Sequence, residues 1–427
     1  MFRIFILLSV LCAGLPTLFC PAFAQPQSAE SDLDPEVSLN DLLRTAGENN
    51  PAIKSAAQAA AASRETAAAS TFLPNPTVTF ENIGSLIPPG LIPGDPSSDR
   101  SYGIEQEIPF PGKLNLKGDI ASAEADVLHW NHEVVRRQVI SDIKQAFFDL
   151  YLIRKSIDIL MKNRELLQNF EQTAESRYMV GQTIQQDVLK AQVEQSKILD
   201  RLLVLGEKKR IAEAKINNLL YRPQGAPVGK PAELKNVELK YSIEELTDMA
   251  LSYAPALKMQ ESEIARREYG LELARKEYYP DFAVGFNYYE RDENPGMYRL
   301  MLSAKLPIWY RKQRHEVDAA SLNLSSAKNQ RDSASSTIRF QVKESYTTAS
   351  TSEKLARLYS SAIVPQANLA LSSAIANYQV GKIDFLQLID SSVSLLEYEL
   401  KYYEAVTNLH KALAQLEPIV GVDLTEG

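Results

Sequence analysis

The sequence has little of what an enzyme or a disulfide-stabilised exported protein uses. Its 427 residues include two cysteines, Cys12 and Cys20, and four histidines. Both cysteines lie in an N-terminal segment that resembles a secretory signal, so the mature chain is expected to have none. Without disulfides, an exported protein has to be stabilised by packing or by oligomerisation.

The first 24 residues predict a cleaved signal peptide. Arg3 supplies the positive start, residues 4–20 are mostly apolar, and Ala22-Phe23-Ala24 fits the small-x-small cleavage pattern. Lipid attachment at a cysteine is the alternative interpretation. Neither Cys12 nor Cys20 follows the small residue that lipidation usually requires, so we predict ordinary cleavage after residue 24.

Two further absences exclude kinds of partner and of membrane attachment. The chain has 54 acidic and 46 basic residues, a formal net charge of −8 and no basic cluster, which argues against nucleic acid as a partner. After the signal segment, no stretch reaches the ~18 consecutive apolar residues of a transmembrane helix. If the chain spans a membrane, it therefore does so with strands.

No catalytic constellation and no cofactor motif is evident. His129 and His132 are spaced i,i+3 on a predicted helix, next to Glu133, which is a spacing that can bind metal. No third ligand is evident, and a solvated helix face is the favoured interpretation. The methionines are scattered, and a glycine-rich phosphate loop is missing. We predict no enzymatic activity, no metal site and no cofactor.

What the sequence does have is an internal duplication with a period of roughly 200 residues. Tyr178-Met179-Val180-Gly181 returns as Tyr378-Gln379-Val380-Gly381, and Asn50-Pro51-Ala52 returns as Ala254-Pro255-Ala256. A long period that is repeated once indicates a duplicated unit rather than a solenoid of short repeats.

Each copy predicts one long helix and two helices of half its length. A proline-free stretch of 67 residues measures about 100 Å as a helix, and the two shorter helices match that length when they are stacked end to end. The expected product is a rod two helices wide. The predicted helices are 38–72, 112–178 and 184–219 in the first copy, and 242–278, 310–378 and 384–416 in the second. Pro51 is expected to interrupt the first of these helices early.

Alternation of apolar and polar residues predicts a pair of strands in each copy, at 75–85, 101–110, 281–291 and 297–308. Their lengths suit the ~10 residues that a tilted strand needs to cross a bilayer. A hairpin packed on a soluble core also alternates and is the other interpretation. Four matched strands of spanning length favour the membrane.

These elements divide the chain and require it to assemble. We assign 1–24 to the signal peptide, 25–219 to the first repeat, 220–241 to an equatorial linker, 242–417 to the second repeat and 418–427 to a C-terminal tail. A bilayer tolerates strands only in a closed barrel, and four strands are too few, since the smallest outer-membrane barrels have about eight. Arithmetic alone allows a dimer or a trimer.

The signal peptide, the duplicated unit and the Y-x-V-G motif followed by Asp187-Val188-Leu189 resemble the TolC family of outer-membrane efflux proteins. The resemblance covers essentially the whole mature chain. It implies a mainly α fold in which a homotrimer forms a 12-stranded outer-membrane barrel, continued by a long periplasmic α-helical barrel. It also implies docking onto a periplasmic adaptor protein and an inner-membrane resistance-nodulation-division pump.

The implied function is that of a passive exit duct in a tripartite efflux pump. The run Gln106–Lys113 is most similar to the branch that serves heavy-metal pumps of the cobalt-zinc-cadmium type, which makes metal cations the expected cargo. Multidrug efflux and type I protein secretion are alternatives that keep the fold. A periplasmic coiled-coil scaffold or adaptor is an alternative of another class.

The repeated motif marks the expected periplasmic entrance. Gly181 and Gly381 can adopt positive φ at a helix end, and each is followed by a new helix, which predicts two tight turns at the far end of the rod. The resemblance implies that these turns form the entrance and contact the adaptor. The residues expected at the tips are Tyr178, Val180, Gly181, Val380 and Gly381.

The resemblance also implies a gate next to these turns. Asp187 and Tyr378 fall where the family has a gate-forming carboxylate and tyrosine, and Asp390 falls where it has an acidic ring at the constriction. Ile383 stands in place of a family arginine, and Gln387 in place of an inner aspartate. We predict a Tyr378–Asp187 contact that holds the entrance shut; an ordinary solvated helix surface is the alternative for the two aspartates.

Overall fold

Long helices make up most of the part of the chain that the computed structural model describes, which is residues 36–234, 237–292 and 295–424. The predicted signal peptide, 1–24, lies outside the described residues. The longest helix is α3, Lys113–Met179, with 67 residues and a length of about 100 Å. It is followed by α4, Gln185–Leu219.

The predicted helices 38–72 and 242–278 are each two helices. The first divides into α1, Leu39–Asn49, and α2, Pro51–Ala69, and the second into α5, Ile243–Tyr253, and α6, Pro255–Lys276. Asn50 and Ala254 adopt extended ψ angles of 121° and 119°, as residues before proline prefer, and this ends the helix. The early interruption predicted at Pro51 is confirmed, whereas the break at Ala254 was not predicted.

The half-length helices meet end to end. The side-chain amide of Asn50 accepts from the backbone amides that open α2, and its Nδ2 donates to the carbonyl of Leu219 at the end of α4, at 2.8 Å. In the second repeat, α9, Phe385–Val420, meets α5 through a close backbone approach. Gly421 has φ +77°, and a Cβ there would lie 2.5 Å from the carbonyl oxygen of Tyr253. The helix predicted to end at 416 thus continues into the segment assigned to the tail, 418–427.

The second repeat also breaks its long helix, which was predicted to be continuous over 310–378. The structure has α7, Tyr310–Leu358, a π-helical turn η1, Tyr359–Ile363, and α8, Val364–Gln379. Pro365 has no amide hydrogen to donate and its ring displaces the preceding turn. The hydroxyls of Ser360 and Ser361 bond back to the carbonyl of Arg357, at 3.2 and 2.7 Å, which favours the wider turn.

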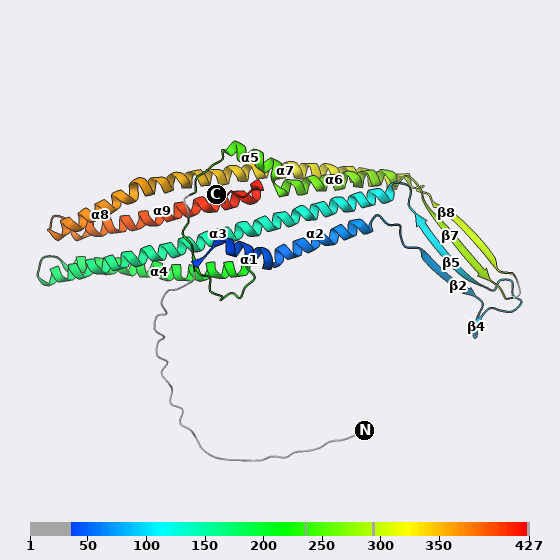
Figure 1. The fold of residues 1–427 in the computed structure, drawn as a ribbon, viewed down its shortest axis with the longest axis horizontal. Coiled ribbons are helices and arrows are strands. Elements are labelled where there is room, and N and C mark those ends of the chain that lie inside the picture. The colour runs from blue at the N-terminus through cyan, green and yellow to red at the C-terminus, as the bar shows by residue number, and fades with distance from the viewer. Residues whose placement is uncertain (1–35, 235–236, 293–294, 425–427) are drawn as a thin grey trace, which may run out of the picture. The chain divides into compact units, whose positions relative to one another are not determined.

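The helices form two overlapping sets of neighbours (Figure 1). On the side of the strands, α2, α3, α6 and α7 lie next to one another in that order, and on the other side α3 packs on α4 and α9 while α8 packs on α9. Buried clusters fill these contacts. One joins α1, α3 and α4 around Ile143 and Phe147, another joins α5, α7 and α9, and a third lies near the interhelical turns around Leu167 and Phe385.

Four strands form an antiparallel sheet in the order β2-β5-β7-β8. Their bounds are Thr77–Ile83, Asp99–Ile108, Asp281–Glu290 and Met297–Lys305. Three of the predicted strands extended too far, to residues 75, 110 and 308. Pro76, Pro109 and Pro307 lie at these ends, and proline cannot donate a backbone hydrogen bond to the sheet. A short pair, β3, Ser85–Leu86, and β4, Pro89–Gly90, lies between β2 and β5.

The linker 220–241 is attached to the helices rather than free. Its strand β6, Lys230–Pro231, pairs in parallel with β1, Glu36–Val37. Glu233 accepts hydrogen bonds from the hydroxyl of Tyr151, at 2.9 Å, and from Lys155, both on α3. The hydrogen bond from Lys155 holds the pKa of Glu233 below its usual value, despite partial burial. This contact fixes the crossing point between the two repeats.

Candidate functional site

The two faces of the sheet differ in chemistry over the middle of its strands. Cross-strand pairing brings four aromatic side chains into one row and four aliphatic or aromatic side chains into the next, and all eight are exposed. These rows are Phe80–Tyr102–Tyr288–Tyr298 and Val78–Ile104–Phe286–Leu300. A large exposed apolar surface of this kind needs an apolar environment.

The opposite face is polar and crowded. Its rows include Thr79–Gly103–Asn287–Arg299 and Thr77–Glu105–Gly285–Met301. Gly103 has no side chain because its place is taken by the neighbours: a Cβ would lie 2.1 Å from Oδ1 of Asn287 and 2.3 Å from Oγ1 of Thr79. Glu105 in the next row adds charge to this face. The polar face suits contact with water.

Aromatic residues border the apolar face at both ends. The row through Tyr102 borders one end, and at the helical end Tyr279 stacks on Phe110 with ring centroids 4.6 Å apart, next to the exposed Trp309. Tyr102 and Phe110 are separated by about 27 Å of extended chain. In a strand tilted by about 40°, this corresponds to a height of about 20 Å, which is close to the ~25 Å apolar band, flanked by aromatic girdles, of strands that cross an outer membrane. None of the described helices is long and apolar enough to span a membrane.

A buried lysine fixes the sheet to the helices. Nζ of Lys113, at the start of α3, lies 3.1 Å from the carboxylate of Glu277 and 3.0 Å from that of Asp281, and it donates to the carbonyl of Tyr279. Asp281 also accepts from the amide of Phe110, at 2.8 Å. Both repeats therefore enter the sheet through one charged junction. The sequence analysis missed this cluster, since its charges come from residues that are about 165 positions apart.

The α3–α4 and α8–α9 turns lie at the other end of the long helices (Figure 1), and each contains one of the repeated glycines. Gly181 and Gly381 have φ +73° and +72°. Their amides donate to Tyr178 and Tyr378, and the next amides donate to residues 177 and 377, which is the Schellman pattern. Of the residues predicted at the tips, Tyr178, Val180 and Val380 are exposed on these turns, which places apolar side chains in reach of a partner.

The two motif tyrosines lie in different surroundings. Tyr378 is 5% exposed and packs on Phe385 with ring centroids 5.6 Å apart, whereas Tyr178 is 45% exposed. The difference follows from the sequence, because Gln185 occupies the position in the first repeat that Phe385 has in the second. Burial raises the pKa of the Tyr378 hydroxyl, the Arg177 guanidinium opposes this, and the nearby Asp187 carboxylate adds to it.

The predicted hydrogen bond between Tyr378 and Asp187 is not formed within the chain. The hydroxyl of Tyr378 has no hydrogen-bond partner among the described residues. The carboxylate of Asp187 instead accepts from the hydroxyl of Thr183, four residues earlier. Thr183 lies just before Ile184, the N-cap residue of α4, whose side chain makes no capping hydrogen bond. Asp187 lies in the first turn of α4, so Thr183 is a partner close to it in the chain.

The other predicted gate residues lie on the first two turns of α9. Asp384 caps this helix by accepting from the amide of Gln387, at 2.8 Å, and Gln387 and Asp390 are both exposed. Ile383, which replaces a family arginine, packs against the apolar cluster around Phe385. The structure thus brings Tyr378 and Ile383 into the core and leaves Asp390 and Gln387 on the surface.

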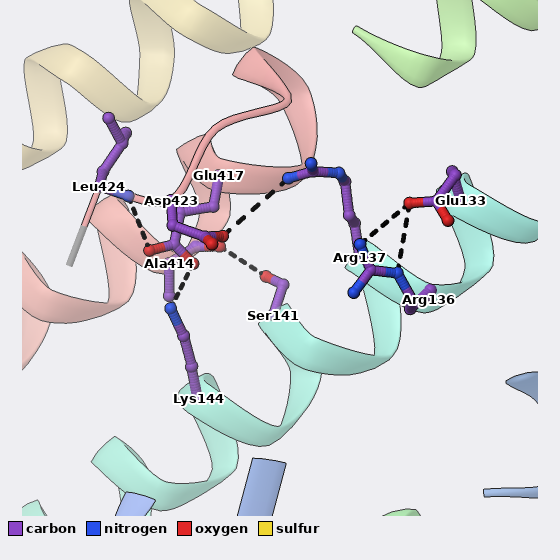
Figure 2. A network of polar contacts seen from close by, with 9 residues as sticks. All are labelled: Glu133, Arg136, Arg137, Ser141, Lys144, Ala414, Glu417, Asp423 and Leu424. Carbon is purple, nitrogen blue, oxygen red and sulfur yellow. Dashed lines mark hydrogen bonds and ion pairs between the residues drawn. The ribbon is translucent and has the colours of Figure 1, made fainter. Parts of the chain in front are cut away.

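A second missed group is a buried ion pair between the repeats (Figure 2). Nζ of Lys144 on α3 lies 2.6 Å from Oε2 of Glu417 on α9, with both side chains about 4% exposed. Oε1 of Glu417 accepts from the amide of Leu424, and Ser141 donates to the carbonyl of Ala414, at 2.8 Å. In sequence, both charges look like parts of an ordinary solvated helix.

In residues 36–234, 237–292 and 295–424, no group of three or more His, Cys, Asp or Glu side chains is arranged to hold a metal ion.

A sheet with one lipid-compatible face, joined to long helices that end in paired turns, is the architecture that the sequence predicts for an outer-membrane channel. Comparison with known proteins agrees. Residues 246–422 match the family described as outer membrane efflux protein. The chain is 21% identical over 349 residues to the cobalt-zinc-cadmium resistance protein CzcC of Cupriavidus metallidurans, which covers 78% of this chain and 79% of that protein.

Solved outer-membrane channels have the same fold. The open state of MtrE from Neisseria gonorrhoeae superposes with a TM-score of 0.75 at 17% identity, covering 95% of this chain and 98% of that one. VceC from Vibrio cholerae gives 0.75 at 15% identity, over 90% and 96%. The second half of the chain thus matches the outer membrane efflux protein family, and the chain as a whole has the fold of solved outer-membrane channels.

Proposed function

We propose that the channel is the exit duct of a tripartite pump that exports heavy-metal cations. The observation that carries the proposal is the sheet, which has lipid-facing aromatic rows on one side and a polar face on the other, at the end of long helices. The cargo is supported by similarity to a cobalt-zinc-cadmium resistance protein over most of both chains. A duct of this kind conducts passively, and the pump supplies the energy.

A homotrimer completes the membrane part. The sheet has two edge strands, β2 and β8, which have no strand paired on their outer side in the part of the chain that the structure describes. Hydrocarbon does not tolerate such edges, so β8 of one copy has to pair with β2 of the next. Three copies give a closed barrel of 12 strands, and the helices then continue it as a tunnel into the periplasm.

The paired turns are the proposed contact for the adaptor. Met179, Val180 and Val380 are 73%, 68% and 67% exposed, although they are apolar. Gly181 and Gly381 hold them at the tips through positive φ. Apolar side chains that are displayed on rigid turns suit docking onto the helical hairpin of a periplasmic adaptor protein, which connects the duct to the inner-membrane pump.

Deleting the gene should make the cell more sensitive to cobalt, zinc and cadmium, because export would stop at the outer membrane. The minimum inhibitory concentration of each metal should fall several-fold, and the gene supplied from a plasmid should restore it. A fall in resistance to hydrophobic drugs with unchanged metal resistance would instead support the multidrug alternative. Loss of a secreted polypeptide alone would support type I secretion.

Asp390→Asn should lower the selectivity of the channel for cations over anions. Three exposed carboxylates around a narrow entrance would concentrate cations, and the substitution removes all three charges. The measurement is the reversal potential of single channels in a salt gradient across a planar bilayer. Asp332→Asn, an exposed carboxylate on α7 away from the turns, is the matched control and should leave the reversal potential unchanged. Identical potentials for wild type and Asp390→Asn would remove Asp390 from the constriction.

A further inference from the structure

Arg177 connects the two interhelical turns of one chain. It lies in the last turn of α3, in the first repeat, and its Nη2 donates to the carbonyl of Gln379, the last residue of α8 in the second repeat, at 2.8 Å. The two residues are 202 positions apart. The C-terminal carbonyls of a helix have no partner within the helix, so a guanidinium is a favourable donor there.

The same guanidinium also covers the buried motif tyrosine. The Cζ atom of Arg177 lies 4.4 Å from the centroid of the Tyr378 ring, which is within the range of a cation–π contact. Because Phe385 packs on that ring as well, Arg177 closes the end of the buried cluster that joins α3, α4, α8 and α9. One side chain thus holds a backbone carbonyl and an aromatic ring of the opposite repeat.

Among the described residues, the second repeat has no equivalent contact. Asn377 stands at the position of Arg177, and its side-chain amide bonds to Ser373 of its own helix, at 2.9 Å. Besides the buried apolar cluster, the link between the turns through Arg177 is therefore one-sided. That residue lies directly beside the exposed tip residues Met179 and Val180.

We propose that Arg177 is a positioning residue that clamps the second interhelical turn against the first and so sets the resting width of the tunnel entrance. This inference rests on the proposed function, in which the two turns line that entrance. The clamp takes the place of the Tyr378–Asp187 hydrogen bond expected from the sequence. It acts through the face of the Tyr378 ring and the Gln379 carbonyl, and it does not need the tyrosine hydroxyl.

Arg177→Ala should loosen the second turn and enlarge the channel. Loss of a charge-assisted hydrogen bond corresponds to a roughly tenfold or greater rise in the rate of local opening. Hydrogen exchange of the full protein in detergent, followed by mass spectrometry, should therefore show exchange about ten times faster for amides in 377–387. Single-channel conductance in planar bilayers should rise in parallel.

Two further variants sharpen the test. Arg201→Ala removes another contact between the repeats, the 2.6 Å ion pair of Arg201 on α4 with Glu397 on α9. It should change neither the hydrogen exchange of residues 377–387 nor the conductance. Tyr378→Phe keeps the ring, so its effect should be much smaller than that of Arg177→Ala. A larger effect of Tyr378→Phe would overturn the clamp in favour of a link through the hydroxyl.

Hydrogen exchange tests the clamp and conductance tests the channel function, so a failure of one can be distinguished from a failure of the other. Unchanged exchange in 377–387 for Arg177→Ala would overturn the clamp, whatever the channel conducts. Faster exchange with unchanged conductance would show that the clamped turns do not set the width of the entrance, and would overturn that part of the inference. A wild-type protein that forms no pores would overturn the exit-duct function, while exchange would still report on the clamp.

Discussion

Replacing Lys144 with methionine should lower the free energy of unfolding by about 3–5 kcal/mol, because it removes a buried cation that lies 2.6 Å from the buried Glu417 carboxylate. The pair spans the two repeats, with Nζ of Lys144 2.6 Å from Oε2 of Glu417 and almost no exposure of either side chain. Glu417 also orders the segment after α9 by accepting from the amide of Leu424. The measurement is the thermal unfolding midpoint of the purified protein in detergent, followed by circular dichroism.

The matched control replaces a lysine or arginine whose ion pair is exposed. Arg210→Met removes an i,i+3 pair with Glu207 whose side chains are 78% and 68% exposed, so it should change stability by less than about 1 kcal/mol. The double substitution Lys144→Met with Glu417→Leu should recover most of the lost stability, since both charges are then absent. Equal midpoints for Lys144→Met and Arg210→Met would contradict a stabilising role for the buried pair.

The sequence predicted the helices and turns well where glycine and proline control the backbone. Gly181 and Gly381 end α3 and α8 with positive φ, as expected from the repeated motif. Apart from the interruption at Pro51, the breaks inside helices were harder to predict. At Asn50 and Ala254, proline at the next position can either begin a new helix or remain in a first turn, and only the stacking on α4 or α9 decides. The π-helical turn before Pro365 is a similar case.

The gate residues show what a sequence pattern leaves undetermined. The motif located Tyr378 at a turn, but its contacts come from Arg177, about 200 residues earlier, and from Phe385 in the next helix. Neither partner has a period or a spacing that connects it to the tyrosine. Asp187 has a closer partner in Thr183, which competes for the carboxylate. The sequence does not reveal buried pairs such as Lys144–Glu417 either. A charged residue on a helix is expected to contact water unless the buried face of that helix is known.

The second large prediction follows from assigning one face of the sheet to lipid and the other to water. Leu302→Lys should strongly reduce assembly in the outer membrane, because it places a charge on the apolar face between the two aromatic borders. Leu302 is 76% exposed and pairs across the sheet with Val284, so no side chain of the same chain could shield the charge. A lysine at the middle of the lipid face costs about 2–4 kcal/mol per copy, and a homotrimer carries three copies.

Ser303→Lys is the control, because it introduces the same lysine in the same strand but on the opposite face of the sheet. Ser303 is the next residue of β8, its side chain belongs to the polar face, and it pairs with Ala283 next to Glu107. A lysine there remains in contact with water and has a carboxylate close by, so assembly should stay near wild type. The amount of detergent-resistant oligomer in isolated outer membranes measures both variants. Equal loss for the two would mean that lipid does not contact the face with the tyrosines, and the membrane position of the sheet would have to be abandoned.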